Sequence, residues 1–235
     1  MCGRSSLSKT EKEIEDRFGS TFYSEELERY NPLPNYNVAP SHYHPVITNE
    51  EMDRIHLFNW GLVPFWAKDR KIAYKMINAR VETLSEKASF KHALKSRRCL
   101  VPMDGFYEWK KEEKGKTPFR IKTKDEEIFS VAGLWEVWKD PQNGENLYSF
   151  TVITQPANEV LKDIHDRMPA ILPRDQERLW LDNSLSTDEL ISLIQPYPDD
   201  LIDFYPVSKE VGNVRNNHKD LIEPISKPPQ QGSLF

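Results

Sequence analysis

The amino-acid sequence predicts an α+β fold with a mixed, largely antiparallel, barrel-like β core and flanking helices. The 235 residues include 17 prolines and 9 glycines, which indicates many rigid turns and short elements. The strand-like segments are not separated by regular crossover helices, so a doubly wound parallel sheet is not expected. The chain has room for one large domain or two small ones, and at 27.5 kDa it can bury a core without metal or disulfide bonds.

Periodicity and turn residues place the individual elements along the chain. Helices are expected at 10–18 (with Ser8 or Thr10 as N-cap), 85–95, 174–181 and 187–194, and a short helix or turn at 158–164. Strands are expected at 54–62, 98–109 (a strand pair, or a strand and a bend, around Asp104-Gly105), 118–122, 128–138, 147–154 and 202–207. Residues 30–40 are interrupted by prolines and cannot form a regular helix.

The end of the chain differs in composition from the rest. From Lys209 onward it is polar and contains scattered prolines, which is typical of a tail and not of a core. We therefore expect one folded domain over residues 1–208 and a polar C-terminal tail over residues 209–235.

Composition limits the compartment and the cofactors. The residues after Met1 contain no apolar signal-peptide core, and no apolar run approaches the roughly 20 residues that a membrane span needs, so we expect a cytoplasmic protein without a membrane partner. Cys2 and Cys99 lie far apart in a reducing compartment, which argues against a disulfide. Two isolated cysteines also make a poor zinc site, and we expect no metal ligands.

The charge is distributed unevenly. The formal net charge is −5, yet residues 68–124 contain 17 Lys and Arg against 7 Asp and Glu, a local net charge of +10. A basic middle region in an acidic chain can provide a face for an anionic ligand, while the remainder discourages indiscriminate binding. The alternative for the lysines of 110–124 is a solvated hairpin.

Cys2 is the first candidate for a reactive residue. Removal of Met1 would place the α-amine and the thiol of Cys2 on adjacent carbons, with reference pKa values near 8 and 8.5. Such a 1,2-aminothiol forms an imine with an aldehyde and then closes a five-membered thiazolidine ring on the same carbon. Gly3 permits a tight backbone beside the reaction centre, and Arg4 supplies a permanent cation that favours a thiolate or binds an anion. The alternatives are a buried structural cysteine and a solvated arginine.

Other segments carry groups suited to the same chemistry. In an extended segment, Asn78 and Arg80 point to one side. Glu108 lies in an aromatic run that would raise its pKa and suit it to transfer protons, although an edge glutamate facing water is an equal alternative. His165 stands beside Asp166 and Arg167, which is unusual for a structural histidine. The aromatic residues of 60–66 could stack on a base or fill a core.

Six ordered motifs together resemble the SRAP family, the SOS response-associated peptidase-like proteins that crosslink to abasic sites in single-stranded DNA. They are Met1-Cys2-Gly3-Arg4, Tyr36-Asn37-Val38-Ala39-Pro40, Trp60-Gly61-Leu62-Val63-Pro64, Asn78-Ala79-Arg80-Val81-Glu82, Gly105-Phe106-Tyr107-Glu108-Trp109 and His165-Asp166-Arg167-Met168-Pro169. The resemblance extends from Met1 to about Val207. It implies a mixed α+β fold with a barrel-like β core, single-stranded DNA with abasic sites as partner, a nucleoid-associated location, no cofactor and a monomer.

The resemblance also implies roles for individual residues. Cys2 would be the nucleophile, Asn78 would orient it, Glu108 would transfer protons, and His165 would be a second acid or base. The implied DNA-binding residues are Arg80 and Arg167, with Arg4, for phosphates, Trp66 for stacking near the lesion, and Pro40 and Thr154 for the pocket wall.

The last five residues suggest a protein partner. Gln231-Gly232-Ser233-Leu234-Phe235 resembles the peptide by which bacterial proteins bind the sliding clamp, of pattern Gln-x-Ser/Asp-Leu-Phe. Leu234 and Phe235 are two apolar residues at the end of a polar tail, which is typical of a docking segment. Gly232 departs from the pattern, which prefers an apolar residue there and so predicts weak binding. The alternative is a tail that packs on its own domain.

Three functions are compatible with these residues. The first is covalent capture and shielding of abasic sites. The second is an N-terminal-nucleophile hydrolase or protease, in which Cys2 attacks an acyl carbon with His165 or Glu108 as base. The third is a DNA-binding module without covalent chemistry.

Overall fold

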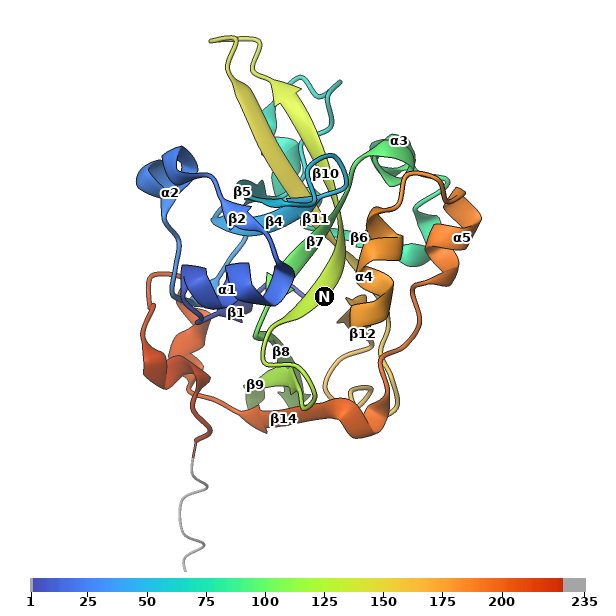
Figure 1. Cartoon of the computed structure of the whole chain (residues 1–235). Helices are drawn as coiled ribbons and strands as arrows, with labels where there is room; N and C mark the ends of the chain where they lie inside the picture. The colour runs from blue at the N-terminus through green and yellow to red at the C-terminus, as the bar shows by residue number, and fades with distance from the viewer. Residues whose placement is uncertain (1, 226–235) are drawn as a thin grey trace, which may run out of the picture.

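A computed structural model describes residues 2–225 of the chain. Two β-sheets and five α-helices form the fold, and Figure 1 shows the long β10–β11 hairpin projecting beyond the rest of the molecule. The α+β class with a largely antiparallel core, expected from the sequence, is confirmed.

The smaller sheet has five strands and is antiparallel throughout. Its order is β14 (Ile202–Pro206), β9 (Gly115–Thr123), β8 (Gly105–Glu112), β1 (Ser5–Leu7) and β3 (Asn35–Val38). The first strand of the chain therefore lies inside this sheet, between β8 and β3.

The larger sheet is mixed. Along its main path the order is β12 (Arg167–Pro169), β11 (Asn146–Pro156), β10 (Phe129–Lys139), β7 (Arg98–Met103), β4 (Tyr43–Thr48), β5 (Arg54–Trp60) and β2 (Thr21–Phe22), and β13 (Ile171–Leu172) and β6 (Asn78–Arg80) pair with β10 and β11. The pairs β11–β5, β11–β6 and β2–β5 are parallel.

The helices lie at the margins of the sheets. They are α1 (Glu11–Phe18), α2 (Ser24–Tyr30), α3 (Ala88–Ser96), α4 (Arg174–Leu181) and α5 (Thr187–Ser192), with short 3₁₀ turns η1 (Arg70–Lys75), η2 (Val81–Thr83), η3 (Asp199–Leu201), η4 (Lys209–Gly212) and η5 (Lys219–Ile222). Helix α1 begins at a capping box formed by Thr10 and Glu13 and ends at Gly19 in the left-handed conformation, as its sequence indicates. No helix among residues 2–225 is long and apolar enough to cross a lipid bilayer.

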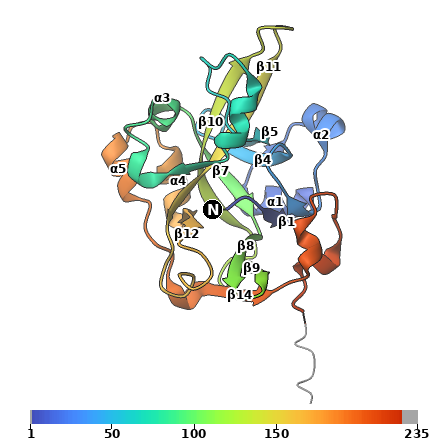
Figure 2. The same cartoon turned by 180° about the vertical axis from the view of Figure 1, so that it is seen from behind.

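The core between the two sheets surrounds the start of the chain. One cluster of buried side chains takes Phe106 and Ile121 from the smaller sheet and Val101 and Phe150 from the larger one, and Cys2 belongs to it. Figures 1 and 2 view this arrangement of the sheets from opposite sides. The fold therefore brings the start of the chain into its interior.

The folded part of the chain extends beyond the boundary at residue 208 that we expected. Val211 and Leu221 are fully buried against Tyr107 and Val207, and the backbone N–H of Ile225 donates to the Pro206 carbonyl at 3.0 Å. The expected tail between 209 and 225 thus packs on the domain. It reads as polar in sequence because only a few of its side chains enter the core.

The buried position of Leu221 predicts that this segment contributes to stability. Leu221→Ala is expected to lower the free energy of unfolding by about 2–5 kcal/mol, as for other buried leucines. Leu179→Ala is the matched control, because Leu179 is 43% exposed on α4 and its loss should cost about 0.5 kcal/mol or less. Urea denaturation measures both values, and equal effects would contradict the packing of the segment.

Candidate active site around Cys2

Cys2 lies three residues before the start of the buried first strand and is itself fully buried. Its thiol points at the Arg4 carbonyl, with Sγ 3.9 Å from that oxygen. Burial, and then the nearby charge of Glu108, raise the pKa of the Cys2 thiol. In this conformation the thiol is therefore protonated near neutral pH, and it lies within electrostatic reach of Glu108.

Asn78 holds the backbone of Cys2. Its Nδ2 donates a hydrogen bond to the Cys2 carbonyl at 2.8 Å. Strand β6 runs parallel to β11, which places Asn78 opposite Val152 and Arg80 opposite Thr154. The short strand thus carries one group to the start of the chain and another to the edge of the site.

Glu108 and His165 approach each other beside Cys2. Glu108 is buried on β8, and burial raises the pKa of its carboxyl to about 7. His165 Nε2 lies 3.9 Å from Glu108 Oε2, while His165 Nδ1 accepts the Arg167 backbone N–H at 3.0 Å and lies 2.9 Å from Asp166 Oδ1. Burial lowers the pKa of His165. A carboxyl with a raised pKa and an imidazole with a lowered pKa therefore flank one side of the site.

Arg167 has its charge partner within the protein. Its guanidinium forms a two-pronged ion pair with the Glu82 carboxylate, and Nη2 also donates to the Thr154 carbonyl at 2.7 Å. This hydrogen bonding lowers the pKa of Glu82. Thr154 is fully buried on β11, and Arg80 is exposed at the end of β6. An anion at this edge would meet Arg80 directly and would compete with Glu82 for Arg167.

Arg4 joins the two ends of the folded chain. Its Nη1 donates to Asn37 Oδ1 at 2.7 Å and to the Val211 carbonyl at 2.5 Å, and its guanidinium lies 5.9 Å from the centre of the Trp109 ring. Asn37 also donates through Nδ2 to the Asn213 carbonyl at 3.0 Å. The structure thus places Arg4, expected on phosphates, in an internal network that anchors β1 to the C-terminal segment.

Pro40 and Trp66 lie outside the buried group around Cys2. Trp66 is 48% exposed on the segment between β5 and β6, and its neighbour Phe65 is 55% exposed. Pro40 lines a surface cavity beside the same segment. Gln231, Leu234 and Phe235 lie outside the described residues.

Sequence reasoning missed two residues that organise the site. Glu82 and Asn37 both occur in the conspicuous motifs, but their partners lie far along the chain, Glu82 pairing with Arg167 and Asn37 with Arg4 and with backbone carbonyls after residue 210. The acidic Glu82 close to the expected phosphate-binding Arg80 was the available signal. The partners of Asn37 are mostly backbone carbonyls, which leave no mark in a sequence.

Comparison with known proteins gives one consistent family. The family described as SOS response associated peptidase (SRAP) matches residues 1–214. The chain is 47% identical to the abasic site processing protein YoqW of Bacillus subtilis over 226 residues, which cover 95% of this chain and 99% of that protein. It is 35% identical to the abasic site processing protein HMCES of Xenopus tropicalis over 231 residues, covering 85% and 68% of the two chains.

Solved structures agree with these relatives. A crystal structure of a protein from Bacteroides thetaiotaomicron superposes with a TM-score of 0.83 at 35% identity and covers 89% of this chain and 93% of that one. A second, from Bordetella bronchiseptica, reaches a TM-score of 0.75 at 23% identity, covers 88% of this chain and all of that one, and supports the fold alone. By its motifs, fold and relatives, the chain belongs to the SOS response-associated peptidase (SRAP) family.

Proposed function

We propose that this protein captures abasic sites in single-stranded DNA by forming a thiazolidine between Cys2 and the opened deoxyribose, and so shields the lesion during the response to DNA damage. The observation that carries the proposal is the convergence of Cys2, Asn78 and Glu108 at the buried start of the chain. The names of the relatives, which are abasic site processing proteins, support the same lesion.

The reaction uses the chain start as the reagent after Met1 is removed. The Cys2 amine attacks the aldehyde carbon, a C–N bond forms, and loss of one water gives an imine. The thiol then adds to the same carbon, its proton passes to the nitrogen, and the ring closes without further loss. Glu108 donates a proton to the sugar ring oxygen and to the departing water, and His165 is positioned to exchange protons with Glu108.

The arginines at the edge of the site bind the DNA backbone. Arg80 holds a backbone phosphate, and Arg167 exchanges its bond to Glu82 for a second one. Thr154 and Pro40 form part of the wall of the DNA-binding pocket, and Trp66 offers an exposed ring on which a base can stack. Because these contacts neutralise phosphates, affinity falls as salt rises.

The raised pKa of the Cys2 thiol favours a reaction whose first step is made by the amine. A hydrolase or protease needs a thiolate from the start, and burial in this site disfavours the thiolate. Imine formation begins instead with the amine, and the thiol enters afterwards, when its proton passes to the imine nitrogen as the C–S bond forms.

Intact mass spectrometry with single-stranded DNA that carries one abasic site tests the capture. The expected product has the mass of the protein without Met1, plus the DNA, minus one water. Cys2→Ala should give an adduct only when a reductant traps its imine, and Cys2→Ser only a labile one. Cys99→Ala is the matched control, because Cys99 is equally buried in the same core but belongs to β7. Loss of the adduct in Cys99→Ala but not in Cys2→Ala would overturn the proposal.

The pH dependence of capture tests the role of Glu108. The carboxyl donates a proton only when protonated, so the single-turnover rate should fall as pH rises through about 7. Glu108→Gln should lower the rate by about 10²- to 10⁴-fold. Its residual rate should instead keep rising toward pH 8 as the amine loses its proton. If the single-turnover rate of Glu108→Gln still fell as pH rose through about 7, that decrease would belong to another group.

Stability provides an independent check on the same carboxyl. The pKa of Glu108 is about 7 in the folded chain against an ordinary 4.5, so the folded state holds the extra proton between these values and the free energy of unfolding decreases as pH rises through this window. Glu108→Gln removes this pH dependence. Between pH 4 and pH 8, the free energy of unfolding of the variant should therefore rise by about 3 kcal/mol relative to that of the unaltered protein. Parallel curves for the two proteins would show that the pKa is not raised.

We also propose that the C-terminal peptide binds the bacterial sliding clamp, weakly because of Gly232. Deletion of Leu234 and Phe235 should abolish binding to purified clamp in a calorimetric titration, while Gln230→Ala, outside the motif, should leave it unchanged. Equal binding by the deleted chain would contradict the proposal.

A further inference from the structure

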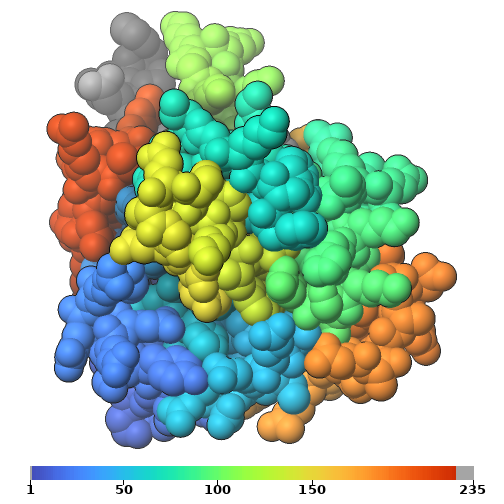
Figure 3. Space-filling view, turned by 90° about the horizontal axis from the view of Figure 1, so that it is seen from above, coloured from blue at the N-terminus to red at the C-terminus, as the bar shows by residue number. Residues whose placement is uncertain are grey.

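A cavity of about 760 Å³ opens on the surface beside Pro40, away from the buried group around Cys2. Its walls come from the start of β4, the end of β5, the turn η1 and the tip of the β10–β11 hairpin. Figure 3 shows the segment that follows Trp60, in teal, lying against this hairpin, in yellow, on the face of the molecule seen from above. Four segments thus enclose one hollow.

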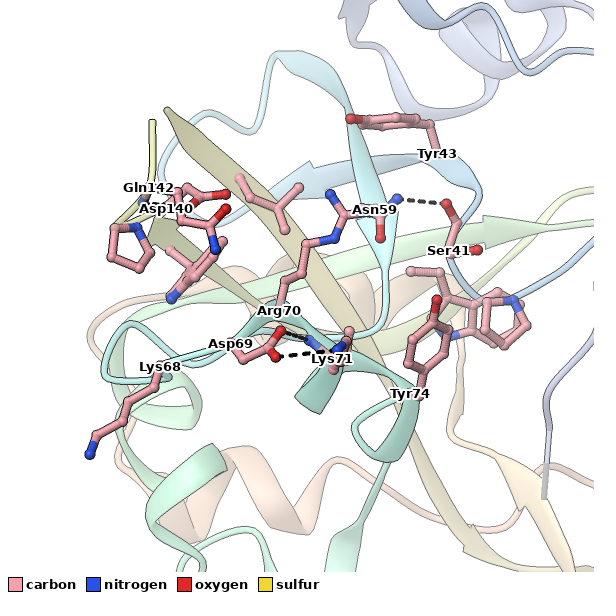
Figure 4. A pocket seen from close by; sticks show the side chains of 16 residues that line it. Ser41, Tyr43, Asn59, Lys68, Asp69, Arg70, Lys71, Tyr74, Asp140 and Gln142 are labelled. Atoms are coloured by element: carbon pink, nitrogen blue, oxygen red, sulfur yellow. Dashed lines mark hydrogen bonds and ion pairs between the residues drawn. The ribbon is translucent and has the colours of Figure 1, made fainter. Parts of the chain in front are cut away.

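The segment between β5 and β6 brings one exposed aromatic ring and several charged side chains to this cavity. Tyr74 is 70% exposed at the cavity rim, and the charged residues are Lys68, Asp69, Arg70 and Lys71. In Figure 4 the guanidinium of Arg70 points into the cavity toward Asn59, whereas Lys68 points away from it. Arg70 forms no ion pair with any residue in 2–225, so its charge is available to a ligand.

The walls are held rigidly by the backbone. Among the described residues, Ser41 is the one non-glycine residue with a positive φ angle, at 73°. Two hydrogen bonds fix it there: its backbone N–H donates to the Trp60 carbonyl, and Asn59 Nδ2 donates to the Ser41 carbonyl at 2.6 Å. Gly61 lets η1 approach, since a Cβ there would lie 2.9 Å from the Ala73 carbonyl oxygen. A cavity whose walls are fixed in this way is more typical of a ligand-binding site than of an accidental gap in packing.

Two chain segments link the walls of the cavity to the proposed site. Trp60 lines it and donates through Nε1 to the Ile77 carbonyl at 2.9 Å, and the next residue, Asn78, bonds the Cys2 carbonyl. On the other wall, Pro40 follows β3, the strand that pairs with β1. A strand of DNA whose lesion lies at Cys2 would therefore place a neighbouring nucleotide in reach of the cavity.

We infer that this cavity binds a nucleotide flanking the lesion, with its phosphate on Arg70 and its base stacked on Tyr74. The inference rests on the proposed function and deepens it, because it assigns the site through which the protein holds undamaged DNA. Asn59 and Gln142 offer amide groups to the edge of the base. Stacking on an exposed ring accepts every base, and the amides provide a preference among them.

Fluorescence anisotropy with lesion-free single-stranded DNA tests this site without requiring any crosslink. Tyr74→Ala should weaken binding by about 5- to 150-fold, the range for loss of one stacked base. Arg70→Gln should make the slope of log K against log salt shallower by about 0.7, the value for one phosphate contact on a single strand. Arg178→Gln is the charge-matched control, since Arg178 is exposed on α4 and does not line the cavity.

Length separates this inference from the proposed function. On 2-deoxyribose 5-phosphate, an abasic sugar without any flanking nucleotide, Tyr74→Ala and Arg70→Gln should crosslink nearly as fast as the unaltered protein, and on a 15-mer with a central abasic site below saturation they should be slower. If the unaltered protein crosslinks but both variants match it on both substrates and in salt slope, the cavity inference alone fails. Equal losses on the isolated sugar and on the 15-mer would also overturn it, because they would indicate a distorted site. If the unaltered protein neither binds nor crosslinks DNA, both proposals fail.

Discussion

The structure depends on the burial of its own first residues. A chain start is normally a surface feature, because it carries a charge and has only one covalent neighbour to restrain it. Here β1 lies between two strands of the smaller sheet, and Cys2 packs in the core between the sheets. A buried polar group is costly without a partner, and Asn78 Nδ2 supplies one to the Cys2 carbonyl.

Arg4 is anchored in a similar way. Its half-buried guanidinium bonds Asn37 Oδ1 and the Val211 carbonyl. The C-terminal segment therefore completes the surroundings of the first strand. The acidic groups of the site are treated differently: Glu82 is neutralised by Arg167, whereas Glu108 is buried with a raised pKa and keeps the capacity to exchange a proton.

Much of the fold could be predicted from local patterns. The capping box of α1, the bend at Asp104-Gly105 and the β-branched and aromatic strands of the β10–β11 hairpin all have local causes, so the sequence indicates them. The packing of 209–225 could not be predicted, because Val211 and Leu221 are single apolar residues in a polar stretch.

In the candidate site, too, some features could be predicted from the sequence and others could not. Residue chemistry and motif order singled out Cys2, Asn78, Glu108 and His165, and the structure places them together. The internal role of Arg4 had no signal, because its partners are mainly backbone carbonyls. The cavity at Arg70 also had none, since it is formed by four segments whose proximity is a property of the folded chain.

The contact between Arg4 and Val211 spans 207 residues and therefore sets an order of events during synthesis. At roughly 5–20 residues per second, the first strand leaves the ribosome some 10–40 seconds before the segment that anchors it. Until then, Arg4 lacks its Val211 partner, and the network that anchors β1 is incomplete. The strand that is synthesised first is therefore the one whose anchoring is completed last.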